Sequence, residues 1–199
     1  MTAIPHRPFD PTGPSTGPRM FQIGYVVEDL FAAAAEWARV YEVGPFHIMP
    51  RVRADCAYRG GAGTLDIRIG IAQAGPVQIE LIQPYSSGPS VFRDLRERYG
   101  RPESGVHHLA TLTARYDDTK ARYDGFGYEL ACEIDTARQR VAFYDTVADF
   151  GYFTEVVEEK PSFLANLEKI ATTCANWDGS DPIRILTREG YTTPPEGGE

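Results

Sequence analysis

FQIGYVVEDL at residues 21–30 and HHLATLTARY at residues 107–116 decide the fold, because each has the pattern of a first strand followed by a turn. Apolar and polar residues alternate along both stretches, which is typical of strands with one buried face. Aligning the two stretches places Gln22 over His108. This internal match indicates two copies of one supersecondary unit.

A second pair of stretches ends the two units. VQIELIQP at residues 77–84 matches YFTEVVEE at residues 152–159, with Glu80 over Glu155 and apolar residues on both sides. The offset is 108 − 22 = 86 residues for the first strands and 155 − 80 = 75 for the last. The second unit is therefore 11 residues shorter, which is an ordinary difference in loop length.

Periodicity and turn residues complete each unit as βαβββ. The first unit is predicted to have strands Met20–Val27, Phe46–Val52, Thr64–Ala72 and Val77–Gln83 and a helix Leu30–Val40. The second is predicted to have strands Val106–Thr113, Tyr128–Ile134, Arg140–Thr146 and Tyr152–Val157 and a helix Tyr116–Phe126. Two further helices are predicted at Pro89–Tyr99 and Ser162–Thr173. The expected fold class is α+β: two tandem βαβββ units that form a cupped mixed sheet, with helices outside and a C-terminal helical extension.

Three segments are expected along the chain. Residues 1–19 carry five prolines and are expected to form an extended arm. Residues 20–159 form the core, with units at about 20–84 and 105–159. Residues 160–199 are expected to form a helix and strap with a loose tail.

Composition excludes several classes of function. The 199 residues carry a formal net charge of −8 without a basic cluster, which argues against nucleic-acid binding. No run of about 18 apolar residues predicts a membrane span. Three scattered cysteines and the lack of a signal peptide indicate a reducing compartment, so we expect a cytoplasmic protein.

Four polar residues stand at matched positions in otherwise apolar strands: Gln22, Glu80, His108 and Glu155. A carboxylate on the buried face of a strand is costly unless it is paired or bound to a metal. Taken singly, each residue could be a hydrogen-bonded core residue or, for the glutamates, a partner of an arginine. Their repeat-matched placement favours convergence on one divalent cation. Strand alternation predicts that only one of His107 and His108 points inward.

The stretches QIGYVVEDL, GPF, VQIELIQP, GVHHLA and YFTEVVE resemble the vicinal oxygen chelate superfamily from about Met20 to Val157. This superfamily includes glyoxalase I, methylmalonyl-CoA epimerase, bleomycin resistance proteins and extradiol dioxygenases. GVHHLA and QIELIQP look most like the epimerase-type branch, although epimerases usually have His where this chain has Gln22. The set Gln, Glu, His, Glu is similar to the ligand set of glyoxalase I.

The resemblance implies a divalent-metal-dependent isomerase, epimerase or lyase that acts on a small carbonyl-containing substrate. The metal would stabilise the enolate formed when the adjacent C–H is deprotonated. Glu155 is the first choice for the base and Glu80 the second. Mixed oxygen and imidazole ligation is compatible with zinc, manganese, iron, cobalt or nickel.

Further residues are candidates for substrate binding. Arg68 shares a strand face with Asp66, and we expect the cup to open on that face, so Arg68 could pair with a substrate carboxylate. Phe143, Tyr144 and His107 could line or support the pocket. The resemblance also implies a homodimer. Two other functions stay open: a ring-cleaving dioxygenase, which normally needs two histidines and one carboxylate, and a non-catalytic protein that sequesters a ligand.

Overall fold

Eight strands from the two units close into one barrel in the computed structural model, which describes residues 17–102 and 104–194. The first unit contains β1 (Arg19–Val26), α1 (Leu30–Tyr41), β2 (Phe46–Ile48), β3 (Val52–Tyr58), β4 (Gly61–Ala74) and β5 (Val77–Pro84). After α2 (Val91–Glu97), the second contains β6 (Gly105–Thr113), α3 (Tyr116–Gly125), β7 (Leu130–Asp135), β8 (Arg140–Tyr144), α4 (Val147–Phe150) and β9 (Phe153–Glu158). The order of strands around the barrel is β1-β5-β4-β3-β7-β8-β9-β6, and β6 returns to β1. The predicted α+β class and the cupped mixed sheet are confirmed.

The two units meet where β1 and β6 run antiparallel. Gln22 lies opposite Ala110, and Gly24 lies opposite His108. At the offset of 86 residues, Gln22 corresponds to His108 and Gly24 corresponds to Ala110. The two pairs are therefore equivalent, and a pseudo-twofold axis passes between them. The strand register predicted from the internal repeat is therefore confirmed for the first strands.

The last strand of each unit obeys the same symmetry. Gly24 of β1 is paired with Glu80 of the parallel strand β5. Ala110 of β6 is paired with Glu155 of the parallel strand β9. Both glutamates therefore occupy equivalent places beside the axis, as their matched sequence positions predicted.

Helices α1 and α3 cover the outside of the barrel. Asp29 caps α1 by accepting hydrogen bonds from the backbone N–H groups of Phe31 and Ala32. Leu30 and Ala34 of α1 are fully buried among residues of β2, β4 and β5. On the other unit, Tyr116 of α3 packs over β8 and β9.

One predicted strand was wrong. Phe46–Val52 is not continuous, because β2 ends at Ile48 and β3 begins at Val52. Pro50 stands between them and has no N–H group to donate to a strand partner. β3 was missed, although it pairs with β4 and with β7 and so joins the two units on the side away from the β1–β6 pair.

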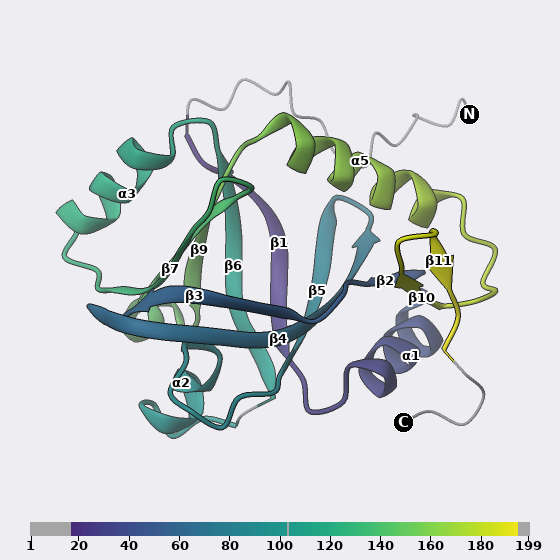
Figure 1. The fold of residues 1–199 in the computed structure, drawn as a ribbon, viewed down its shortest axis with the longest axis horizontal. Coiled ribbons are helices and arrows are strands. Elements are labelled where there is room, and N and C mark those ends of the chain that lie inside the picture. The colour runs from purple at the N-terminus through teal and green to yellow at the C-terminus, as the bar shows by residue number, and fades with distance from the viewer. Residues whose placement is uncertain (1–16, 103, 195–199) are drawn as a thin grey trace.

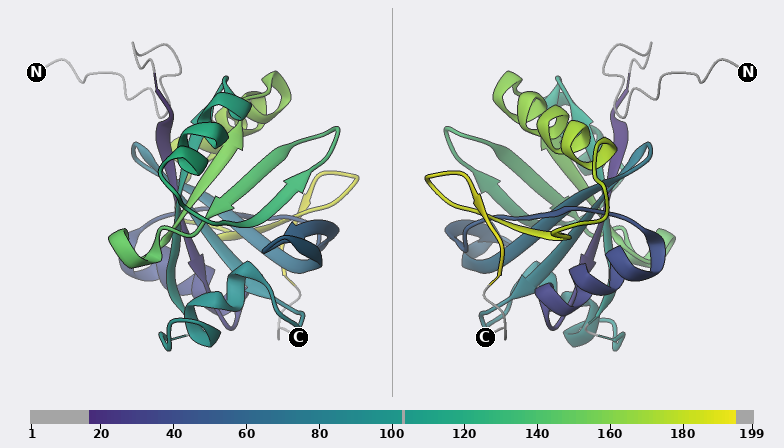
Figure 2. Two further views of the ribbon diagram at one scale, coloured as in Figure 1. Left: turned by 90° about the vertical axis from the view of Figure 1, so that its left-hand side faces the viewer. Right: turned by 90° about the vertical axis from the view of Figure 1, so that its right-hand side faces the viewer.

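The two ends of the barrel are covered by different helices. Figures 1 and 2 show α5 (Pro161–Ala175) across one end and α2 at the opposite end. The chain after α5 forms β10 (Ile183–Leu186), which adds in parallel to β2, and β11 (Tyr191–Thr192). The predicted strap is thus partly an extension of the sheet. Most of the predicted arm, residues 1–16, and the last five residues of the tail lie outside the described residues.

Within the described part of the chain, no helix is both long enough and apolar enough to cross a membrane.

Candidate metal centre

Three side chains from three strands converge inside the barrel: Glu80 of β5, His108 of β6 and Glu155 of β9. Each offers one ligand atom, and these atoms all lie within 4.8 Å of one another. The Nε2 atom of His108 is 3.4 Å from a carboxylate oxygen of Glu80 and 3.2 Å from one of Glu155. One chain therefore brings together three of the four residues predicted as ligands, without a contribution from a second subunit.

Gly24 makes room for the imidazole. A Cβ atom at this position would lie 2.0 Å from Cε1 of His108, which is much closer than van der Waals contact allows. The ring of His108 therefore lies directly over the backbone of β1. The glycine of the QIG sequence thus serves the close approach of a side chain from the other unit.

His107 is also inside the barrel, which corrects the prediction that alternation sends the two histidines to opposite faces. Both are fully buried, and their Nδ1 atoms are 3.0 Å apart. The reason is a β-bulge: Gly24 and Tyr25 are consecutive in β1, but they pair with His108 and Val106, so His107 is an extra residue in β6. A bulge interrupts alternation and re-aims a side chain.

The hydrogen bonds of His107 determine where the ring protons lie. Its Nε2–H donates to the backbone carbonyl of Val91 at 2.9 Å, because a carbonyl can only accept. Burial lowers the pKa of His107 to about 3, so the ring is neutral and its Nδ1 is an acceptor. Nδ1 of His108 therefore carries the proton of the bond between the two rings. This leaves Nε2 of His108 as the atom directed at the two glutamates.

The cluster is strongly coupled electrostatically. Burial lowers the pKa of His108, but the carboxylates of Glu155 and Glu80 outweigh this effect and raise it to about 9. Burial raises the pKa of Glu80. The neighbouring His108 opposes this rise, and the charge of Glu155 adds to it. Without a metal, a protonated His108 is the cation that balances the two carboxylates.

Gln22 lies in the same cavity as the two glutamates. Its amide nitrogen donates to Oε1 of Gln78 at 2.8 Å, so its carbonyl oxygen is the atom left to coordinate a cation. Sequence reasoning did not single out Gln78 as a site residue. The signal was present, because Gln78 shares a strand face with Glu80, two residues away.

A cavity of about 350 Å³ adjoins the cluster. Its walls are mainly apolar and come from both units: Ile67, Ile69, Ile71, Ile82, Val141, Phe143 and Val157. Phe92 of α2 and Phe163 and Leu167 of α5 also line it. The predicted pocket residue Phe143 is therefore placed at the cavity.

Two of the predicted substrate-binding residues lie elsewhere. Arg68 is on the outer face of β4, because the isoleucines on either side of it line the cavity, and its guanidinium lies 4.9 Å from the centre of the Phe31 ring. The expectation that its face opens into the cup was wrong. Tyr144 follows Phe143 on β8 and so points outward, where its hydroxyl donates to Asp124 at 2.9 Å.

The donor set fits a divalent ion. His108 Nε2 and Glu155 Oε2 are both buried and lie 3.2 Å apart, but neither makes a hydrogen bond among the described residues. Such atoms are costly to bury unless something else binds them. Two carboxylates neutralise a divalent charge, and an imidazole nitrogen and an amide oxygen suit the first-row transition metals.

Comparison with known proteins places this geometry in a family. A model of the Glyoxalase/Bleomycin resistance protein/Dioxygenase superfamily matches residues 21–143. The chain belongs to this superfamily. No curated protein sequence matches it significantly.

Solved structures of similar fold include two methylmalonyl-CoA epimerases and a hypothetical protein. A methylmalonyl-CoA epimerase in complex with methylmalonyl-CoA and NH4+ has a TM-score of 0.53 and 22% sequence identity, over 72% of this chain and 96% of that one. A single-residue variant of the Streptomyces coelicolor methylmalonyl-CoA epimerase, in complex with 2-nitronate-propionyl-CoA, has a TM-score of 0.53 and 21% identity, over 72% and 95%. The hypothetical protein BH1468 from Bacillus halodurans C-125 has a TM-score of 0.51 and 18% sequence identity, over 72% of this chain and 96% of that one. At these identities the likeness establishes the fold.

Proposed function

We propose that Glu80, His108 and Glu155, with Gln22 as a fourth ligand, hold one divalent metal ion in a glyoxalase- or epimerase-type enzyme. The enzyme acts on a small carbonyl compound by removing a proton from the carbon next to the carbonyl. The observation that carries this proposal is the convergence of three potential ligand atoms within 4.8 Å, beside a largely apolar cavity. The buried Nε2 of His108 and Oε2 of Glu155 support it, because they make no hydrogen bond among the described residues.

The bound ion would act as a Lewis acid that polarises the substrate carbonyl and acidifies the neighbouring C–H. The residues of the chain would do the rest. Glu155 is our first choice for the proton acceptor, and Glu80, which also lines the cavity, is the second. Apolar walls would keep water away, and this strengthens electrostatic interactions with the substrate. His107 would hold the His108 ring with its Nε2 toward the ligand cluster.

The donor set argues against a ring-cleaving dioxygenase. Iron-dependent enzymes of that kind use two histidines and one carboxylate. His107 is the second histidine here, but Val91 and His108 occupy its two nitrogens. The cluster therefore offers one imidazole and two carboxylates.

Metal analysis of the purified protein tests the binding part of the proposal. We expect about one divalent ion per chain in the wild type and at least tenfold weaker binding in Glu155→Gln. Glu158→Gln is a matched control on the same strand, because Glu158 pairs with Arg140 outside the cluster. If Glu155→Gln and His108→Ala bind metal as tightly as the control does, the proposed site is wrong.

Deuterium exchange tests the chemistry. The metal-loaded protein should incorporate solvent deuterium at the carbon next to a carbonyl in at least one member of a panel of ketones, 2-oxo acids, thiohemiacetals and acyl thioesters. Exchange should be lost in Glu155→Gln if this residue is the base. A protein that binds metal and panel ligands but exchanges none of them would instead be a ligand-sequestering protein, for which the apolar cavity is also suited.

A further inference from the structure

Among the described residues that line the cavity, none is a lysine or an arginine. The charged lining residues are Glu80 and Glu155, both acidic, and the other polar ones are neutral: Gln22, Gln78, Thr136, Gln139 and Asn166. The imidazole of His108 faces the two carboxylates. A divalent ion in the cluster would therefore bring the site to about zero net charge, and nothing in the walls would balance a further anion.

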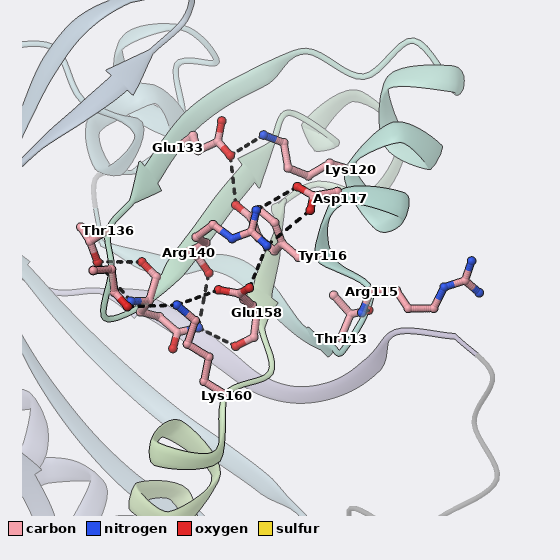
Figure 3. Close-up of polar contacts among 12 residues, drawn as sticks. Thr113, Arg115, Tyr116, Asp117, Lys120, Glu133, Thr136, Arg140, Glu158 and Lys160 are labelled. Carbon is pink, nitrogen blue, oxygen red and sulfur yellow. Dashed lines mark hydrogen bonds and ion pairs between the residues drawn. The ribbon is translucent and has the colours of Figure 1, made fainter.

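Two basic side chains next to the cavity, Arg140 and Lys160, are engaged in ion pairs. Figure 3 shows them beside Thr136, one of the lining residues. Arg140 binds Asp117 at 2.9 Å and Glu158 at 2.7 Å, and Lys160 binds the other oxygen of Glu158 at 3.0 Å. These cations hold α3, β8 and β9 together, and they do not line the cavity.

The residues of helix α5 that line the cavity are also uncharged. Phe163 and Leu167 of α5 line the cavity, and the Phe163 ring meets the Phe21 ring edge-on at 6.1 Å. The exposed residue Asn166 lines the cavity as well. α5 lies beyond the residues matched by the family model, so this cover is a feature of the chain outside that match.

We infer that the cavity takes an uncharged, largely apolar carbonyl compound and discriminates against carboxylates and coenzyme A thioesters. With the charges of the two glutamates balanced by the ion, a substrate carboxylate would bring an extra negative charge among walls that offer it no cationic side chain, and burying such a charge is costly. The lining also offers no cationic side chain to the phosphates of a coenzyme A thioester. The cavity, at about 350 Å³, is near the lower end of the roughly 300–1,000 Å³ typical of small-molecule sites. This inference rests on the proposed function, because it names the substrate class of the same site.

A matched pair of ligands tests the inference with little change in shape. 1-Phenylpropane-1,2-dione and benzoylformate differ at one end, where the dione has a methyl group and benzoylformate has a carboxylate oxygen. Their affinities for the metal-loaded protein can be measured by displacement of 1-aminoanthracene, an uncharged fluorescent probe, with methylmalonyl-CoA as a third competitor. We expect the dione to bind at least about tenfold more tightly than either anion.

An added charge makes the test specific to this cavity. Asn166→Lys places a cation at the mouth, and because Asn166 is exposed the variant should fold normally. It should improve benzoylformate affinity relative to dione affinity several-fold. Thr172→Lys adds the same charge at an exposed residue of α5 that does not line the cavity, and it should change neither affinity. The inference is overturned if benzoylformate or methylmalonyl-CoA binds as tightly as the dione, or if neither the probe nor the dione binds.

Metal content, measured separately on the same samples, distinguishes this failure from failure of the proposed function. A protein that binds metal but prefers anions would overturn only the substrate class. A protein that prefers the dione but binds no metal at the cluster would overturn only the proposed function.

Discussion

The first strands of the two units make the same β-bulge, but they use it for different side chains. Phe21 and His107 occupy equivalent positions at the offset of 86, and each is the extra residue in the pairing of β1 with β6. Phe21 meets Phe163 of α5, whereas His107 donates to a backbone carbonyl of α2. The shared backbone irregularity thus closes one end of the barrel with an apolar contact and the other with a hydrogen bond.

On the last strands the polar residue is in the first unit and the apolar residue is in the second. Gln78 of β5 is paired with Gln22, and its equivalent in β9, Phe153, is paired with His108. Gln78 accepts a hydrogen bond from Gln22, while the Phe153 ring stacks on His107 at 5.0 Å between ring centres. In the first unit the bulge carries an apolar ring and the last strand carries the residue that hydrogen-bonds the ligand Gln22. In the second unit the bulge carries the residue that hydrogen-bonds the ligand His108, and the last strand carries the apolar ring. The repeat conserves the arrangement of the ligands while their support differs.

The largest effect should come from the contact that crosses the pseudo-twofold axis. Gly24→Ala would put a methyl group into the His108 ring, so either the ring or the strand pairing must shift. We expect a loss of stability of about 1–3 kcal/mol and loss of stoichiometric metal binding. Urea unfolding and metal titration would measure the two effects.

The equivalent position in the second unit supplies the control. Ala110→Gly removes a methyl group from the place opposite Gln22. It should cost about 1–2 kcal/mol, from backbone entropy and the loss of a buried methyl group, and leave metal binding intact because no ligand is displaced. Equal metal affinities in Gly24→Ala and Ala110→Gly would show that the close approach over Gly24 is not needed for the site.

The next largest effect on metal affinity should come from His107, the residue at the bulge of the second unit. His107→Phe makes this unit resemble the first and removes the hydrogen bond to Nδ1 of His108. Metal affinity should fall about 10- to 100-fold, as is usual when the orienting partner of a ligating histidine is lost. The ¹⁵N chemical shifts of the His108 ring should also change from one fixed tautomer to a mixture. Phe21→Leu, at the equivalent bulge, should leave both properties unchanged.

The sequence predicts the repeat, the α+β class and the faces of the strands that carry Glu80 and Glu155, because these follow from hydrophobic periodicity and internal matching. It does not predict the bulge at His107, because an extra residue in a strand has no periodic signature until its partner strand is known. It also misplaces Arg68. Alternation along β4 was correct, but which face of a strand lines a cavity depends on how the whole sheet closes.

Because only the second unit has an imidazole beside the axis, the metal-free protein should respond to pH through that unit. The folded-state pKa of His108 is about 9, above the ordinary value of 6.5. The stability from its interaction with the carboxylates is therefore fully present below pH 6.5 and lost as pH rises toward 9.

Urea unfolding of chelator-treated protein between pH 6.5 and 9 would measure this decline in the free energy of unfolding. It should disappear in His108→Gln and remain in Gln22→Ala, the equivalent change in the first unit. A stability that is independent of pH between 6.5 and 9 in the wild type would contradict the ion-paired arrangement.

The smallest effect should come from the polar partner of the first unit. Gln78→Leu removes the acceptor that orients the Gln22 amide, while Glu80, His108 and Glu155 keep their positions. Metal affinity should fall by less than about tenfold, because an amide oxygen is neutral and contributes less than a carboxylate or an imidazole. Isothermal titration of the variant against Phe153→Leu, the equivalent change in the second unit, would isolate the orienting effect from a loss of packing. A decrease as large as that of His107→Phe would mean that the two units hold the metal equally and that the asymmetry between their supporting residues has no energetic consequence.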